Sequence, residues 1–202
     1  MSGGKKAHVE VKKELDALVK DFLSYAIARS SAIRRYNTTK VIIDQNDLEH
    51  MGAVTMISML FSDYFNKIGI SNDTEKVMRI AITHDLDEAV SGDVPHDAKY
   101  QFGKNSDKLR SALEQLSEST VETMYNMIKH KDMRSRYMEL YKEQKTRKSV
   151  ESKIVKLADY VDVIVYCENE MKMGNKELSA DRENAVSRLD ELLDKILKEH
   201  NS

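Results

Sequence analysis

The sequence predicts a single all-α domain, built as a bundle of about seven or eight helices. Its composition supports this, because the 202 residues include only 7 Gly and 1 Pro while 33% are charged. Such a composition is typical of long helices joined by few complex turns. Apolar residues recur at helical spacing along most of the chain, and no segment shows the alternation of a strand. Because the length suits one hydrophobic core, we expect residues 1–202 to form one domain.

The predicted elements follow from apolar periodicity and from capping residues. Residues 1–8 are rich in Gly and Lys, and we expect them to be disordered. The helical period is lost at 32–40, which predicts a loop, and the basic run at 145–148 is most simply a solvated helix end. In chain order, the predicted helices cover residues 9–30, 47–67, 74–91, 107–129, 133–145, 149–162 and 181–199.

Charge and cysteine content narrow the function classes. With 32 Lys+Arg against 34 Asp+Glu, the net charge of −2 gives no overall field for a nucleic-acid polymer or an anionic membrane. No apolar run approaches the roughly 20 residues that span a bilayer, and the polar N-terminus lacks the apolar stretch of a signal peptide. The one cysteine, Cys167, excludes an internal disulfide and is most simply a small core residue. We therefore expect a cytoplasmic protein.

The adjacent pair His84-Asp85 is the clearest sign of chemistry. Imidazole and carboxylate together suit Mn, Co, Zn, Fe or Mg. The predicted helix should continue through the pair to Ser91, which would put the carboxylate of Glu88 on the same face, within reach of a metal-bound water. Two ligands cannot hold an ion alone, so the remaining ones must come from elsewhere in the chain.

Further ligands have to be sought on other helices. His50 lies in the first turn of the helix at 47–67, where a lone histidine is more simply a satisfied core or cap residue. Asp159 and Asp162 adjoin the apolar stripe of the helix at 149–162. An aspartate beside a core is costly unless a positive group meets it. We take Asp159 as the better candidate ligand, with Asp162 in reserve.

These residues form an ordered pattern on an all-helical chain that resembles the HD-domain metal-dependent phosphohydrolases. The segment His84-Asp-x-x-Glu-x-x-Ser-Gly-Asp-x-Pro95, followed by Lys99-Tyr100, resembles the bacterial 5′-deoxynucleotidase branch of that superfamily. The downstream Lys156-x-Ala-Asp159 and the upstream Arg35-Tyr36 also fit. The likeness runs from about Arg34 to beyond Asp159.

The resemblance implies a helical bundle of the HD-domain type with one divalent ion at its centre, which would be Mn, Co, Mg, Zn or Fe. It implies that Glu88 is the general acid or base. The implied metal ligands are His50, His84, Asp85 and Asp159. The implied substrate contacts are Arg35 and Lys99 or Lys156 for the phosphate and Tyr36 for the nucleotide.

Three positions depart from the pattern of that branch. Tyr36 stands where the family usually carries Trp, which puts the base or sugar contact in doubt. Asp47 replaces the usual Val in the motif before His50. His96 occupies a position where a small residue is common. A second metal is not expected, because His96 and His130 are the only extra histidines near the right elements.

The resemblance favours a 5′-deoxynucleotidase that releases phosphate from deoxynucleoside monophosphates, because the Ser91-Gly92-Asp93-x-Pro95 segment matches that branch. One alternative is a deoxynucleoside triphosphate triphosphohydrolase, which would need more basic residues near the metal. A second alternative is a non-catalytic nucleotide-binding scaffold, which predicts a damaged ligand set. The resemblance also implies a homodimer or a higher homo-oligomer. Basic residues available for a triphosphate are Arg34, Arg35, Lys40, Lys99, Lys104 and Lys156.

Overall fold

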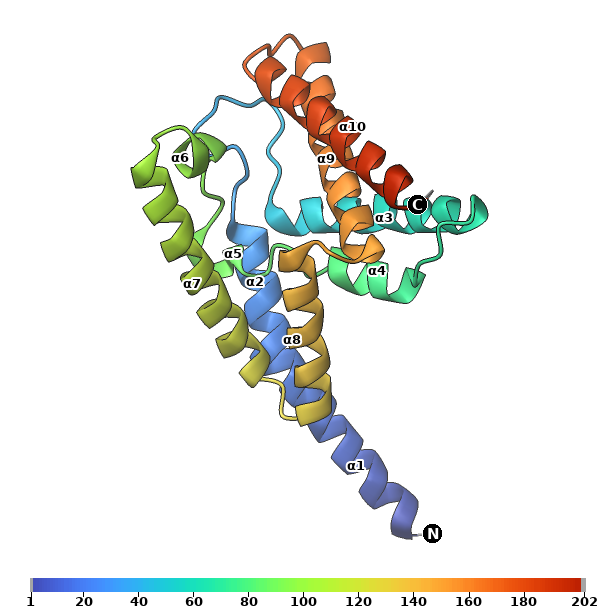
Figure 1. The fold of residues 1–202 in the computed structure, drawn as a ribbon. Coiled ribbons are helices and arrows are strands. Elements are labelled where there is room, and N and C mark those ends of the chain that lie inside the picture. Colours follow the sequence, from blue (N-terminus) through green and yellow to red (C-terminus); the bar gives the residue numbers. More distant parts are fainter. Residues whose placement is uncertain (1, 201–202) are drawn as a thin grey trace. The chain divides into compact units, whose positions relative to one another are not determined.

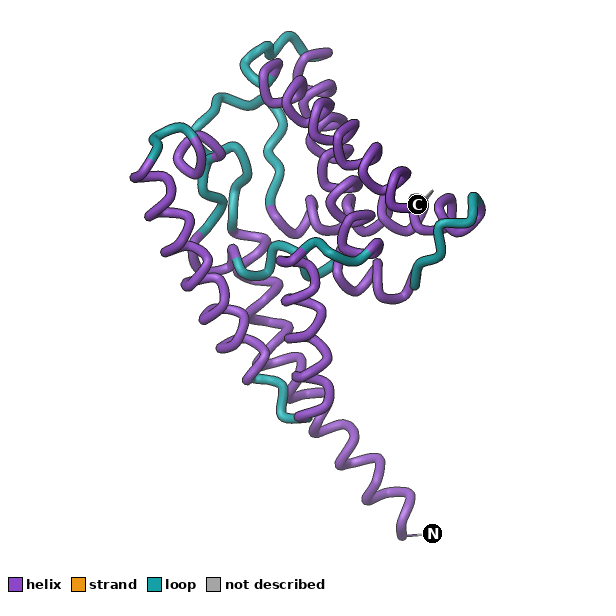
Figure 2. The backbone as a smooth tube through the Cα atoms, viewed as in Figure 1, coloured by secondary structure: helices purple, strands orange, loops and turns teal. Residues whose placement is uncertain are grey.

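A computed structural model of the chain describes the backbone of residues 2–200 and the side chains of residues 7–95 and 98–200. Within that backbone there is no strand, only an isolated antiparallel bridge between Arg34 and Asn46 (Figure 2). The all-α prediction is confirmed. The helices shown in Figure 1 are α1 (Ser2–Ala17), the π-helical η1 (Leu18–Leu23), α2 (Ser24–Ala32), α3 (Asp47–Lys67), α4 (Thr74–Ala81), α5 (Glu88–Ser91), α6 (His96–Tyr100), α7 (Lys104–Asn126), α8 (Lys131–Thr146), α9 (Val150–Lys172) and α10 (Ser179–His200).

The chain divides into two compact units. The first combines Met1–Ile33 with Leu86–Met138, and the second combines Arg34–Asp85 with Glu139–Ser202. The first unit therefore holds α1, η1, α2, α5, α6 and α7, and the second holds α3, α4, α9 and α10, with the boundary falling inside α8.

In the second unit, α9 packs against α3, α4 and α10 (Figure 1). Apolar side chains from three of these helices are fully buried, among them Val54, Val77 and Ile154. The helix starts agree with the capping residues in the sequence. Asn46 forms a capping box with Glu49 at the start of α3, and Ser149 accepts a hydrogen bond from a backbone N–H in the first turn of α9.

In the first unit, α7 packs against α5 and α6, and α2 packs against α5. Aromatic rings hold its core together. The rings of Phe22 and Tyr125 have centroids 5.8 Å apart, and Tyr125 and Tyr137 are 5.5 Å apart. Helical backbone begins at Ser2, although the sequence predicts disorder at 1–8 and a helix from Val9. Lys and Ala residues ahead of Val9 are good helix formers, which is consistent with the earlier start.

The predicted helix at 74–91 is wrong beyond Ala81. α4 ends there, residues 82–87 form turns, and α5 starts at Glu88. The prediction that His84, Asp85 and Glu88 lie on one face of a continuous helix is therefore also wrong.

Side chains just after α4 explain why the helix ends. The hydroxyl of Thr83 donates to the carbonyl of Arg79 at 2.8 Å, and Nδ1 of His84 lies 2.7 Å from the carbonyl oxygen of Ala81. Polar side chains that bond nearby carbonyls in this way compete with the backbone ladder. The turn that results carries His84 and Asp85.

Two further predictions can be compared with the structure. Cys167 is a buried core residue, as predicted; it packs with Tyr166 and Leu178, and burial raises the pKa of its thiol to about 11. Along the described residues, no helix combines the length and apolarity needed to cross a membrane.

Candidate metal centre

His50 is held in one orientation by a buried carboxylate. It lies in the first turn of α3 and is fully buried. Its Nδ1 lies 2.6 Å from Oδ2 of Asp162 on α9. Because a carboxylate accepts hydrogen bonds, Nδ1 carries the proton and donates it, which leaves the lone pair on Nε2. The sequence assigned Asp162 only a reserve role as a ligand and missed this orienting contact.

His84 is oriented in the same way by the backbone. The carbonyl oxygen of Ala81 accepts from Nδ1, so the lone pair of His84 is again on Nε2. The Nε2 atoms of His50 and His84 face one another at 3.2 Å. At this distance the two nitrogens either share a proton in a hydrogen bond or ligate one cation, because two bare lone pairs would repel each other.

Two carboxylates complete the cluster. Oδ2 of Asp85 lies 3.4 Å from Nε2 of His50 and 3.2 Å from Nε2 of His84. Oδ1 of Asp159 lies 3.3 Å from Nε2 of His50. Ligands about 2.1 Å from one ion are separated by about 3.0–3.4 Å at neighbouring coordination positions. The separations among His50, His84 and Asp85 match that geometry, and these three residues form a group that can hold a metal ion. Asp159 adjoins the group through its contact with His50.

The electrostatics of the cluster favour a cation strongly. Burial lowers the pKa of His50, as does Arg35, but the hydrogen bonds that His50 donates to Asp159, Asp162 and Asp85 outweigh both and raise its pKa to about 10. A divalent ion bound at Nε2 would displace that proton, since metal and proton compete for the same lone pair.

The two aspartates stay ionised despite their burial. Burial raises the pKa of Asp85, but the charges and hydrogen bonds of His84 and His50 hold it well below its usual range. Burial also raises the pKa of Asp159, and Lys156 and His50 hold it well below its usual range. Both carboxylates are therefore available as anionic ligands at neutral pH.

The loop after residue 33 brings Arg35 to the same cluster. Nη1 of Arg35 lies 3.7 Å from Oδ2 of Asp85. The ring of Tyr36 is stacked on Tyr166, with centroids 4.6 Å apart and planes 4° from parallel, and burial raises its pKa. One ring face of Tyr36 is thus covered by protein.

A buried carboxylate that the sequence did not single out anchors this loop. Glu170 on α9 is fully buried and accepts from the backbone N–H groups of Ile42, at 2.9 Å, and of Ile43, and from the side chain of Asn175. Tyr166 donates its hydroxyl to the carbonyl of Ile43. The loop that carries Arg35 is therefore fixed to α9.

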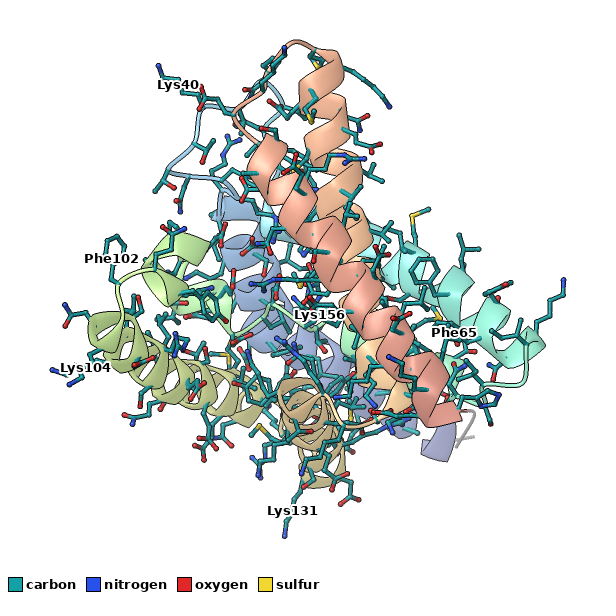
Figure 3. All side chains as sticks on the ribbon, turned by 45° about the horizontal axis from the view of Figure 1, so that its top comes forward. Lys40, Phe65, Phe102, Lys104, Lys131 and Lys156 are labelled. Atoms are coloured by element: carbon teal, nitrogen blue, oxygen red, sulfur yellow. The ribbon has the colours of Figure 1, made fainter. Side chains whose placement is uncertain are left out.

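Lys156 projects from α9, and its position is labelled in Figure 3. Its ammonium pairs with Oδ2 of Asp159 and lies 4.6 Å from the ring centroid of Tyr160. It borders a cavity of about 60 Å³ beside the cluster. The cavity is lined by His84, Asp85, Gln144, Arg147, Ser152, Val155, Lys156 and Asp159.

The remaining predicted site residues belong to the first unit. Glu88 begins α5, and its Oε1 lies 3.8 Å from Nζ of Lys99 on α6. The structure thus pairs these two predicted residues with each other. His130 lies 3.5 Å from a carboxylate oxygen of Glu14, and the side chain of His96 lies outside the described residues.

The comparison with known proteins settles which family the chain represents. The family model of the YfbR-like 5′-deoxynucleotidases matches residues 21–199. The chain belongs to this family. The resemblance to HD-domain phosphohydrolases of the 5′-deoxynucleotidase branch is therefore confirmed, and with it the prediction of an enzyme of that class.

Individual relatives agree with this assignment. A 5′-deoxynucleotidase from Shewanella oneidensis is 28% identical over 165 residues, covering 81% of this chain and 82% of that protein. A solved conserved hypothetical protein from Pyrococcus furiosus is 27% identical with a TM-score of 0.69, covering 89% of this chain and 94% of the other. The crystal structure of an HD-domain phosphohydrolase from Listeria innocua is 22% identical with a TM-score of 0.65, and the match covers 87% of this chain and 79% of the other. This likeness confirms the HD-domain fold.

Proposed function

We propose that this chain is a metal-dependent 5′-deoxynucleotidase, which hydrolyses a deoxynucleoside monophosphate to a deoxynucleoside and orthophosphate. The observation that carries the proposal is the convergence of Nε2 of His50, Nε2 of His84 and a carboxylate oxygen of Asp85, at separations of 3.2–3.4 Å, in a chain of the YfbR-like family. Asp159 adjoins this group, 3.3 Å from Nε2 of His50. The name of the Shewanella oneidensis relative supports the same substrate class.

The residues present fit one divalent ion, with His50, His84, Asp85 and Asp159 as its ligands. A divalent ion held there, whether Mn, Co, Mg, Zn or Fe, would screen the phosphoryl oxygens and lower the pKa of water at the site. Hydroxide and a phosphate monoester otherwise repel each other, because both are negative.

The protein's own groups supply the remaining chemistry in this proposal. Glu88 accepts a proton from the attacking water or delivers one to the departing 5′ oxygen. The guanidinium of Arg35 contacts the phosphoryl oxygens, on which negative charge is concentrated. Lys156 and Lys99 add positive charge for the phosphate, and Tyr36 packs on the nucleotide. Lys156 also holds Asp159 in place through their ion pair.

A triphosphate substrate is the alternative, and the surroundings of the cluster favour the smaller anion. Arg34 is paired with Asp44 at 2.6 Å, and both side chains are exposed. Lys40 is also exposed and extends away from its loop (Figure 3). Neither Arg34 nor Lys40 borders the cavity beside the cluster. A non-catalytic scaffold is disfavoured, because all four ligand residues are intact.

Three broader features are part of the proposal. The family model spans residues of both units, which supports one HD domain over residues 1–202. The resemblance supports a homodimer or higher homo-oligomer, and a sedimentation mass of one chain at micromolar concentration would refute it. The cytoplasmic location rests on the single cysteine and is tested by fractionating cells that express the chain.

Product analysis tests the function. Protein loaded with Mn, Co or Mg is incubated separately with deoxynucleoside mono- and triphosphates, and the released phosphate species is identified. We expect orthophosphate from the monophosphate and no release of triphosphate. Asp85→Ala and a chelator should each abolish turnover, while Asp190→Ala, which changes an exposed aspartate of α10, should not. Triphosphate release, or turnover that survives Asp85→Ala, would refute the proposal.

A further inference from the structure

The wall of the cavity formed by the end of α8 and the start of α9 has features that the proposed function does not use. It contains Gln144 near the end of α8, Arg147 directly after α8, and Ser152 from the first turn of α9. The cavity measures about 60 Å³, well above the roughly 10–15 Å³ needed for one water molecule. It therefore has room for a group larger than water next to His84 and Asp85.

We propose that Arg147 binds the phosphoryl group of the substrate from this wall. The inference rests on the proposed function for the identity of the substrate. Arg147 lies within the basic run at 145–148, which the sequence suggested to be no more than a solvated helix end. Its place in the wall of the cavity distinguishes it from its neighbours in that run.

Charge is the first argument for this assignment. Lys156, which also lines the cavity, is already paired with Asp159, and Arg35 lies 3.7 Å from Asp85. Arg147 makes no ion pair within the described side chains, although it borders a cavity that contains two carboxylates. It is thus a lining cation that an incoming anion can engage without breaking an existing pair. A guanidinium also offers two parallel N–H groups that match two phosphoryl oxygens.

Backbone conformation is the second argument. Arg147 has φ of 50°, and within residues 2–200 the other non-glycine residue with positive φ is Tyr36, which follows Arg35 in the loop beside the cluster. Arg147 directly follows α8, a position where a left-handed residue is usually Gly or Asn. An arginine there costs free energy that a glycine would avoid. Such strain is found where the side chain serves another purpose.

The rest of the wall suits an anionic ligand that also carries a hydroxyl. Ser152 lies in the first turn of α9, a helix of 23 residues whose N-terminal end favours negative charge. The side-chain carbonyl oxygen of Gln144 is buried and has no hydrogen-bond partner among the described residues. A hydroxyl of the deoxyribose would supply the donor that this oxygen lacks.

The test compares three variants in the metal-loaded protein. Arg147→Gly removes the guanidinium and relieves the left-handed backbone, so it should fold at least as well as the wild type. Arg147→Lys keeps the charge but not the paired donors. Lys148→Ala is the matched control, because Lys148 is the neighbouring exposed cation and does not border the cavity. For each, kcat and KM are measured with dAMP, together with metal content.

We expect Arg147→Gly to raise KM about tenfold to a hundredfold, with unchanged metal content, because a charge-assisted contact to the substrate is lost. Arg147→Lys should fall between it and the wild type, and Lys148→Ala should match the wild type. An unchanged KM in Arg147→Gly would overturn the assignment.

Binding of inorganic phosphate separates this inference from the proposed function. Calorimetry on the metal-loaded wild type and on Arg147→Gly needs no turnover, and we expect the dissociation constant for phosphate to rise by a similar factor in the variant. If the wild type hydrolyses no deoxynucleotide but its phosphate binding depends on Arg147, the proposed function fails and the anion site stands. Equal phosphate binding by the two proteins would overturn the anion site, whatever the activity.

Discussion

Removing the carboxylate of Asp162 should weaken metal binding, although this residue lies outside the four proposed ligands. Its Oδ2 accepts the Nδ1 proton of His50 at 2.6 Å and also lies 3.3 Å from Nε2 of Gln45. This contact fixes the tautomer that presents Nε2 of His50 to the cluster. Asp162→Ala removes the hydrogen-bond acceptor of His50, and Asp162→Asn keeps an acceptor but removes its charge.

The magnitudes follow from the burial of His50. In Asp162→Ala, the Nδ1 proton of a fully buried ring loses its acceptor, which costs about 1–3 kcal/mol of folding stability. Loss of such a partner typically lowers metal affinity about 10- to 100-fold. Asp162→Asn keeps an acceptor but loses its charge. The bond then weakens by about 1–1.5 kcal/mol, which corresponds to a loss of metal affinity of about fivefold to thirteenfold.

The assay is competition for Zn or Co between the protein and a chromophoric chelator, followed by activity against free metal concentration. We expect the order of affinity to be wild type, then Asp162→Asn, then Asp162→Ala, with much of the turnover restored at saturating metal. Asp190→Asn, at an exposed position on α10, is the control and should bind like the wild type. Wild-type metal affinity in Asp162→Ala would refute the orienting role.

Two further predictions concern carboxylates outside the ligand set. Glu88→Gln should lower turnover of deoxynucleoside monophosphates at least about a hundredfold, because general acid–base catalysis typically contributes that much. Metal content, measured by elemental analysis, should stay the same. Unchanged turnover would refute the role of Glu88 as general acid or base. Burial raises the pKa of Glu170, but the hydrogen bonds that it accepts from Ile42, Asn175 and Ile43 lower that pKa overall. Ionised Glu170 therefore stabilises the fold fully at pH values above 4.5, the usual pKa of a glutamate. This contribution is lost as the pH falls through the lowered pKa. Urea unfolding should therefore find Glu170→Gln less stable than the wild type at pH 7, with the difference shrinking below pH 4.5; a constant difference would contradict this.

The sequence identified much of the cluster because its chemistry is local in the chain. His84 and Asp85 are adjacent, and an aspartate beside an apolar stripe, as at Asp159, indicates a positive partner. The capping residues likewise marked the starts of α3 and α9, since those hydrogen bonds join residues close in sequence. Family resemblance was needed for His50, whose position alone was compatible with an ordinary core residue.

The features that the sequence missed depend on contacts between distant segments. Whether Asp162 would bind metal or orient His50 depends on how α9 packs on α3, and periodicity does not specify that packing. In the sequence, nothing distinguishes Glu170 from the other charged residues, because its hydrogen bonds are to the distant loop residues 42 and 43. The end of α4 was misjudged because the side chain of His84 bonds the helix's own last turn. Arg147 differed from the other residues of a basic run only through its backbone angle and its place at the cavity.

We propose that His50, His84, Asp85 and Asp159 together hold one catalytic ion. The most direct test is to strip the protein with a chelator, return Mn or Co in steps, and follow orthophosphate release from dAMP. We expect activity to be absent at the start, to rise in proportion to added metal and to level off at about one equivalent per chain, as for a single site with these four ligands. Activity without metal, or a rise that continues to two equivalents per chain, would contradict it.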